Sequence, residues 1–234
     1  MTANLNRLKS LAKKNITNKY TEQITIDAIA DKIDMAIDSL HDREDFTKYY
    51  YNIYIENIKN FKSILQLISK KEGEIAIKAN LISCMQNLHI LHDVLSYIIS
   101  LSLDMKIEDK DITFYKLKKH LEMKNKQEYK TLISYIDELS KKSDYKYLNA
   151  NVNHSKHRYH IDLDISIDMK EYPPKLYSLF RSFDYHSLEK KNTVIHYPEM
   201  DASLFLIREY NRETELIIKI ENELIYILEN IEDN

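Results

Sequence analysis

The stretch that separates two sequence patterns in this chain is LNANVNHSKHRYH, residues 148–160. Before it, apolar residues recur at the three- and four-residue spacing that is typical of helices. After it, apolar and polar side chains alternate from Tyr159 to Met169. Because successive side chains of a strand point to opposite faces, this alternation predicts a strand with one apolar face. We therefore expect helices up to about residue 158 and strands directly after it.

Glycine and proline are almost absent, with one Gly and three Pro among 234 residues. The glycine is Gly73, and the first proline is Pro173. A chain with so few turn-forming residues favours long helices. One glycine also excludes the glycine-rich motifs of P-loop proteins, dinucleotide-binding folds and serine hydrolases. The single cysteine, Cys84, excludes an intrachain disulfide and is expected to be a small buried side chain.

Hydrophobic periodicity predicts the order of the elements. Helices are expected over residues 3–14, 21–71, 74–103, 111–124, 127–142, 143–158 and 200–232, and strands over 159–169, 176–185 and 193–197. Within 21–71 we favour two helices joined by a charged bridge at 41–45, with Gly73 ending the second.

The predicted fold class is mainly α. We expect an up-and-down helical bundle with a small antiparallel β hairpin or meander, at about 159–197, inserted before a long C-terminal helix. All of this is expected to form a single α-rich domain over 1–234, with the bundle at 1–158 and the closing helix at 200–232. No run approaches the roughly 18 apolar residues of a membrane span, so we expect a cytoplasmic protein without membrane contact.

The first candidate site lies at the end of the helix that enters the junction. Asn153, Lys156 and His157 are spaced so that they share one helical face, and Arg158 follows. An amide, an ammonium and an imidazole on one face can bind a phosphate, and a histidine can exchange a proton near neutral pH. The planar guanidinium of Arg158 suits a phosphate or a carboxylate. The alternative is a helix C-terminus whose positive side chains offset the helix dipole.

The second candidate cluster is His89, His92 and Asp93 on the most apolar helix. His89 and Asp93 are one turn apart, so the carboxylate can orient the imidazole. For His92, which lies near the apolar stripe, we favour a buried histidine with a structural role. If the bundle covers Asp93, its carboxylate needs a partner, which Lys156, His157 or Arg158 could provide. Such a pair could also be a purely structural lock between two helices.

A metal site is not expected, and no cofactor is implied. His154, His157 and His160 are evenly spaced, but the change from helix to strand scatters their directions, and no metal-binding motif accompanies them. Residues 116–158 carry 11 Lys and Arg against 5 Asp and Glu. This basic segment could meet phosphates, although we favour a solvated helix face.

The pair of segments LHDVL, residues 91–95, and NHSKHR, residues 153–158, resembles a pattern found in bacterial helical proteins of unknown function, which are similar in turn to the HEPN superfamily. The resemblance covers about residues 75–160 and implies a compact helical bundle. Many HEPN proteins are metal-independent RNases of toxin–antitoxin, abortive-infection and phage-defence systems, and others are interaction modules. The HEPN nuclease element, an Arg followed by His on one helix, is matched only approximately by Arg181 and His186, which fall on an expected strand.

The resemblance implies a module that binds nucleic acid or protein in a bacterial defence or stress system. RNA or a partner protein is the expected partner, and a homodimer stays open. The first alternative is a metal-independent RNase, in which His157 exchanges protons, Arg158 and Lys156 stabilise phosphate charge and Asn153 orients the phosphate, with His89 or Asp93 in support. The second alternative is a structural or interaction protein with a buried lock between Asp93 and the Lys-His-Arg run.

Overall fold

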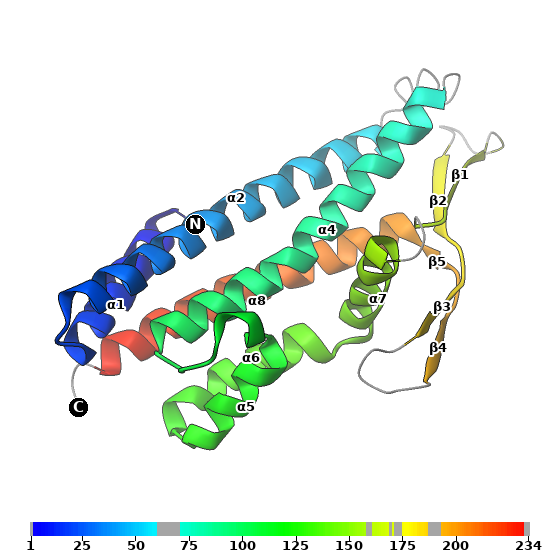
Figure 1. The fold of residues 1–234 in the computed structure, drawn as a ribbon. Coiled ribbons are helices and arrows are strands. Elements are labelled where there is room, and N and C mark those ends of the chain that lie inside the picture. The colour runs from blue at the N-terminus through cyan, green and yellow to red at the C-terminus, as the bar shows by residue number, and fades with distance from the viewer. Residues whose placement is uncertain are drawn as a thin grey trace. The chain divides into compact units, whose positions relative to one another are not determined.

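The computed structural model describes residues 2–59, 71–157, 161–168, 170, 175–186 and 193–231. Its α-helices are α1 (Thr2–Lys19), α2 (Gln23–Lys59), α4 (Lys71–Ser102), α5 (Phe114–Lys124), α6 (Lys130–Lys141), α7 (Ser143–His157) and α8 (Ala202–Ile231). Its strands are β1 (Leu163–Asp168), β2 (Lys175–Phe180), β3 (Phe183–His186), β4 (Val194–Tyr197) and β5 (Met200–Asp201), and short 3-10 helices are η1 (Asp109–Asp111) and η2 (Gln127–Tyr129). The fold is mainly α, with a small set of antiparallel strands before the long helix α8, as the sequence predicts (Figure 1).

The chain divides into two compact units, each made of separate pieces of sequence. Unit 1 contains Met1–Glu44, Ile90–Lys142 and Arg212–Asn234, and unit 2 contains Asp45–His89 and Ser143–Asn211. The long helices α2, α4 and α8 each contribute residues to both units. The expectation of one domain over 1–234 stays a prediction.

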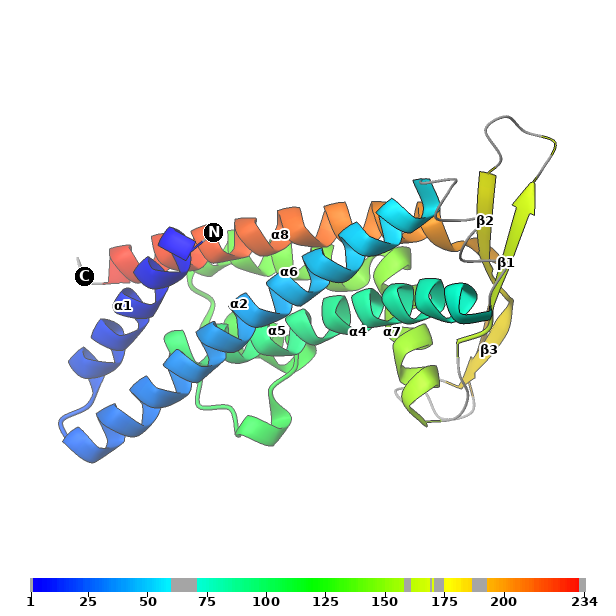
Figure 2. The same ribbon diagram turned by 90° about the horizontal axis from the view of Figure 1, so that it is seen from above.

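Unit 1 is built on the first part of α2, the last part of α4 and the end of α8. Ion pairs connect α1 to both α2 and α8, and both views place α1 beside them: Lys13 Nζ lies 2.6 Å from Asp34, and Arg7 pairs with Glu229 (Figures 1 and 2). Unit 1 also contains the helical hairpin of α5 and α6. Asn125 ends α5 with φ 46°, a left-handed conformation that Asn tolerates better than most residues.

Unit 2 packs α7 and the first part of α8 against the strands. β1 pairs antiparallel with β2, from Leu163 opposite Phe180 to Asp168 opposite Lys175, and β5 extends this sheet beside β2. Leu163 and Phe180 are both buried, so the alternation seen in the sequence places the apolar face toward the interior. β3 pairs with β4 in a separate two-stranded sheet.

Three expectations about element boundaries were wrong. α2 is one continuous helix of 37 residues, because the segment 41–45 contains no Gly or Pro and the buried residues Thr47 and Tyr54 continue its inner face. Gly73 does not end a helix but lies in the first turn of α4, and no glycine has a positive φ angle among the described residues. The expected strand at 176–185 is two strands, β2 and β3, which pair with different partners.

None of the helices in the described part of the chain combines the length and the apolar character needed to cross a membrane.

Candidate binding face on helix α7

A polar chain of three side chains joins α4 to α7 within unit 2. The carbonyl oxygen Oδ1 of Asn149 accepts a hydrogen bond from Nδ2 of Asn153 at 2.8 Å. The same oxygen lies 2.8 Å from Nε2 of His89. Because a carbonyl oxygen can only accept, His89 donates from Nε2, and this bond selects the tautomer of the ring. His89, which the sequence offered as a supporting residue, is therefore connected to Asn153 through Asn149.

The burial of these residues decides what each can do. His89 is only 8% exposed, whereas Asn149 and Asn153 are half-buried. A nearly enclosed imidazole that donates to a neighbouring amide holds that amide in place. His89 therefore acts as a positioning residue for the polar face of α7. Asn149 and Asn153, which are partly exposed, form that face.

The face continues along α7 by helical spacing. Residue 153 follows 149 by four positions, residues 156 and 157 follow 153 by three and four, and the helix extends to His157. The side chains of Lys156 and His157, as well as the whole of Arg158, lie outside the described residues, as do the side chains of His154 and His160. Asn153 is thus the one member of the expected catalytic set whose side chain is described.

Contacts at the start of α7 hold this helix in place. The carboxylate of Asp144 accepts two hydrogen bonds from the guanidinium of Arg208 on α8, at 2.5 and 2.8 Å. A bidentate pair of this kind fixes the orientation of the carboxylate relative to the guanidinium. The aromatic ring of Tyr147 is buried among aromatic residues of the strands and of α8, which are Phe180, Phe183, Tyr197 and Phe205. The apolar face of α7 is therefore anchored opposite to its polar face.

His92 is a buried histidine, as the sequence predicts. It is 3% exposed, its ring packs against Phe114, and its Nε2 lies 3.0 Å from a carboxylate oxygen of Glu213 on α8. Glu213 itself is fully buried and also lies 3.4 Å from the guanidinium of Arg212. Sequence reasoning missed Glu213. The available signal was its position four residues before Ile217, on the same apolar seam of the final helix.

The sequence left the burial of Asp93 open, and the structure shows that the bundle does not cover it. The residue is exposed on α4 in unit 1, where it borders a pocket with residues of α2 and η1. An exposed carboxylate keeps its hydration and needs no buried partner. This exposure does not support a buried lock between Asp93 and the Lys-His-Arg run, whose side chains lie outside the described residues.

Among the described residues, three of the six lysines of α5 and α6 form ion pairs with nearby acids. Nζ of Lys118 lies 2.7 Å from Asp137 and 3.3 Å from Glu122, and this contact with Asp137 raises the pKa of the lysine. Lys116 pairs with Asp111, and Lys141 also pairs with Asp137. This part of the basic segment is thus a surface of alternating charges, in agreement with a solvated helix face.

Within the residues that the structure describes, no three His, Cys, Asp or Glu side chains lie where they could hold a metal ion. No family model, curated protein or solved structure matches the chain. The resemblance to HEPN proteins stays a prediction.

Proposed function

We propose that the chain is a HEPN-like binding module of a bacterial defence or stress system, which recognises RNA through the C-terminal half of α7 without cleaving it. The observation that carries the proposal is the hydrogen-bonded chain from His89 through Asn149 to Asn153. It holds a polar face of α7 in a defined geometry before any partner arrives. Preorganised polar groups bind with a smaller loss of conformational entropy.

Charge supports RNA as the partner. No Asp or Glu occurs from Tyr145 to Ile161, whereas this segment contains Lys146, Lys156 and Arg158 together with three histidines. Lysine and arginine contacts to phosphates provide most of the affinity of proteins for nucleic acids. The asparagines on the same face can add hydrogen bonds to base edges or to sugar hydroxyls.

Burial favours binding over catalysis. A general base has to reach the proton that it removes, within hydrogen-bond distance. His89 is nearly enclosed and donates to Asn149, so it is suited to positioning. Of the expected catalytic residues, His157 would have to supply the acid–base chemistry of a ribonuclease.

The test compares two double variants that remove the same charge. In Lys156→Ala/Arg158→Ala the proposed phosphate contacts are lost, and Lys119→Ala/Lys130→Ala removes two exposed lysines of unit 1. Binding of a fluorescently labelled single-stranded RNA is followed by anisotropy at several salt concentrations. We expect the first variant to bind about tenfold more weakly and to lose roughly 1.5 from the slope of log K against log salt, with little change in the control.

Each other outcome has a defined meaning. Equal weakening in both variants would show that only net charge matters, and the proposed face would be abandoned. Failure of the unaltered protein to bind RNA would also overturn the proposal. RNA that is shortened by the unaltered protein but not by His157→Ala would replace it with the ribonuclease alternative.

A further inference from the structure

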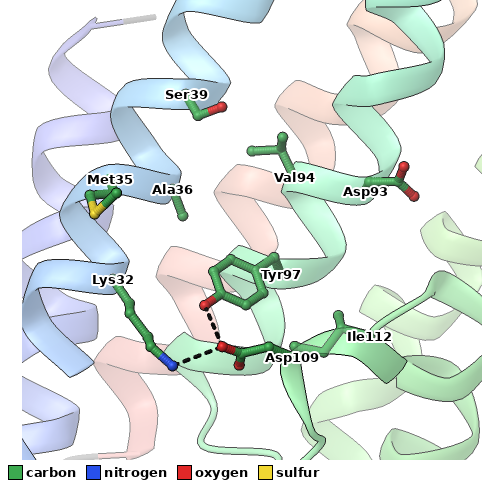
Figure 3. A pocket seen from close by; sticks show the side chains of 9 residues that line it. All are labelled: Lys32, Met35, Ala36, Ser39, Asp93, Val94, Tyr97, Asp109 and Ile112. Atoms are coloured by element: carbon green, nitrogen blue, oxygen red, sulfur yellow. Dashed lines mark hydrogen bonds and ion pairs between the residues drawn. The ribbon is translucent and has the colours of Figure 1, made fainter. Parts of the chain in front are cut away.

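Unit 1 contains a pocket of about 410 Å³ between α2, α4 and the segment around η1. This volume falls in the lower part of the range of small-molecule sites. Its lining combines apolar and polar side chains, drawn in Figure 3: Lys32, Met35, Ala36, Ser39, Asp93, Val94, Tyr97, Asp109 and Ile112. None of these residues belongs to the α7 face.

At one end of the pocket, a lysine, an aspartate and a tyrosine contact one another, and the charges of the first two cancel. Nζ of Lys32 lies 2.8 Å from Oδ2 of Asp109, and the hydroxyl of Tyr97 donates to the same oxygen at 3.3 Å (Figure 3). The hydrogen bond between the two charged groups lowers the pKa of Asp109 and raises the pKa of Lys32, so both stay ionised at neutral pH. The positive charge of Lys32 is thus already balanced within the pocket.

The walls provide an apolar surface. Val94 and the ring of Tyr97 extend from α4 toward Met35 and Ala36 on α2, as Figure 3 shows. Met35 is 72% exposed, so much of its side chain is open to solvent. Its unbranched thioether can adjust to ligands of different shape. An apolar body in the pocket would cover Met35 and remove this surface from water.

Asp93 gives the pocket its net charge. It stands on α4 at the side away from α2 (Figure 3), and no described residue forms an ion pair with it. With Lys32 and Asp109 cancelling, the lining carries one net negative charge. The hydroxyl of Ser39 adds a further hydrogen-bonding group. An anionic ligand would meet two carboxylates and no available cation in this lining.

We propose that this pocket binds a small organic cation, a protonated amine attached to an aromatic or alkyl body. The amine lies at Asp93, and the body covers Val94 and Ile112. Such a ligand matches both properties of the lining, because its charge complements the free carboxylate and its body covers the apolar wall.

The test uses tyramine and its uncharged analogue N-acetyltyramine, with binding measured by isothermal titration calorimetry on the full chain. We expect tyramine to bind about tenfold more tightly than the analogue, as one charge-assisted hydrogen bond allows. Asp93→Asn should reduce tyramine affinity to that of the analogue. Asp42→Asn, which removes an exposed carboxylate of α2 outside the pocket, should leave it unchanged.

A second variant tests the cavity itself. Val94→Trp places an indole in the pocket and should abolish tyramine binding, while the melting temperature shows that the protein stays folded. Equal affinity for both compounds would overturn the assignment of a cation. Unchanged tyramine binding by Asp93→Asn or by Val94→Trp, or no binding by the unaltered protein at millimolar tyramine, would overturn the site.

Discussion

Glu221 on α8 is a buried carboxyl group whose two oxygens accept no hydrogen bond from any described residue. The residue is 1% exposed. Burial, and in second place the nearby carboxylate of Glu44, raise its pKa from the ordinary 4.5 to about 8. Glu213 on the same helix differs, since it lies beside His92 and Arg212. Glu221 therefore stays protonated at neutral pH.

The raised pKa of Glu221 makes the free energy of unfolding depend on pH. Between about 4.5 and about 8 the unfolded chain loses the proton of Glu221 while the folded protein keeps it. The free energy of unfolding therefore falls as pH rises, by at most about 1.4 kcal/mol per pH unit from this group. Below pH 4.5 both states are protonated, so the full stability is present there.

We predict that Glu221→Gln stabilises the protein at pH 8 by roughly 2–4 kcal/mol, because an uncharged amide replaces a carboxyl that resists ionisation. The gain should vanish near pH 4.5. Urea unfolding at several pH values measures it, with the exposed residue Glu215 changed to Gln as a control. A gain of equal size at every pH would contradict the assigned pKa.

At the scale of elements, three hydroxyl groups connect α2, β2 and α8 in unit 2. The hydroxyl of Tyr54 lies 2.7 Å from Ser178 and 2.8 Å from Ser203, and the two serines lie 2.9 Å apart. Burial raises the pKa of Tyr54, so its hydroxyl stays protonated. This contact connects the continuous helix α2 to the sheet and to the first turn of α8.

We predict that Tyr54→Phe lowers the free energy of unfolding by about 1–2 kcal/mol, because the hydroxyls of Ser178 and Ser203 lose a buried partner. For a chain of this size the melting temperature should fall by roughly 2–8 °C. Tyr49→Phe provides the matched control, since that ring is 59% exposed on the same helix. Equal melting temperatures for the two variants would show that the hydroxyl contact contributes nothing.

At the scale of the whole molecule, each unit is assembled from pieces that are distant in sequence. Unit 1 combines residues 1–44 and 90–142 with the C-terminal piece Arg212–Asn234. Glu213, the partner of the buried His92, lies in that last piece. A fragment that stops before α8 therefore leaves an imidazole and much apolar surface uncovered.

We predict that the fragment 1–142 does not form a cooperative fold. It should keep helical circular dichroism, because its helices have strong local patterns, but lose a sharp thermal transition and bind a hydrophobic dye. The fragment 1–231, which keeps all of α8, should unfold like the full chain. A sharp transition of the fragment 1–142 would show that unit 1 folds without the end of α8.

The predictable part of the fold follows from local patterns. The alternation from Leu163 to Asp168 predicts the strand β1. The apolar stripe that includes Leu88 and Leu95, which is buried in the structure, predicts α4. The errors arose where local signals were weak or conflicting. The absence of Gly and Pro from 41–45 allowed a continuous helix, but the charged pattern there did not decide between one helix and two. No local pattern showed that the chain changes sheet between Phe180 and Phe183.

The candidate site was predictable only in part, for the same reason. His89 and Asn153 were named from their positions on helical faces, but Asn149, which joins them, was not. The burial of Asp93 could not be decided from the sequence, because the exposed side of a helix depends on which neighbours cover it.

The sequence by itself determined that the protein is mainly helical, with strands at about residues 159–197, because both features depend on spacing along a few turns or residues. Only the tertiary structure decided that His89 meets Asn149, that Glu213 meets His92 and that Asp93 borders a pocket. These contacts join residues far apart in the chain. Their existence depends on how the helices fold back on one another, which no local pattern records.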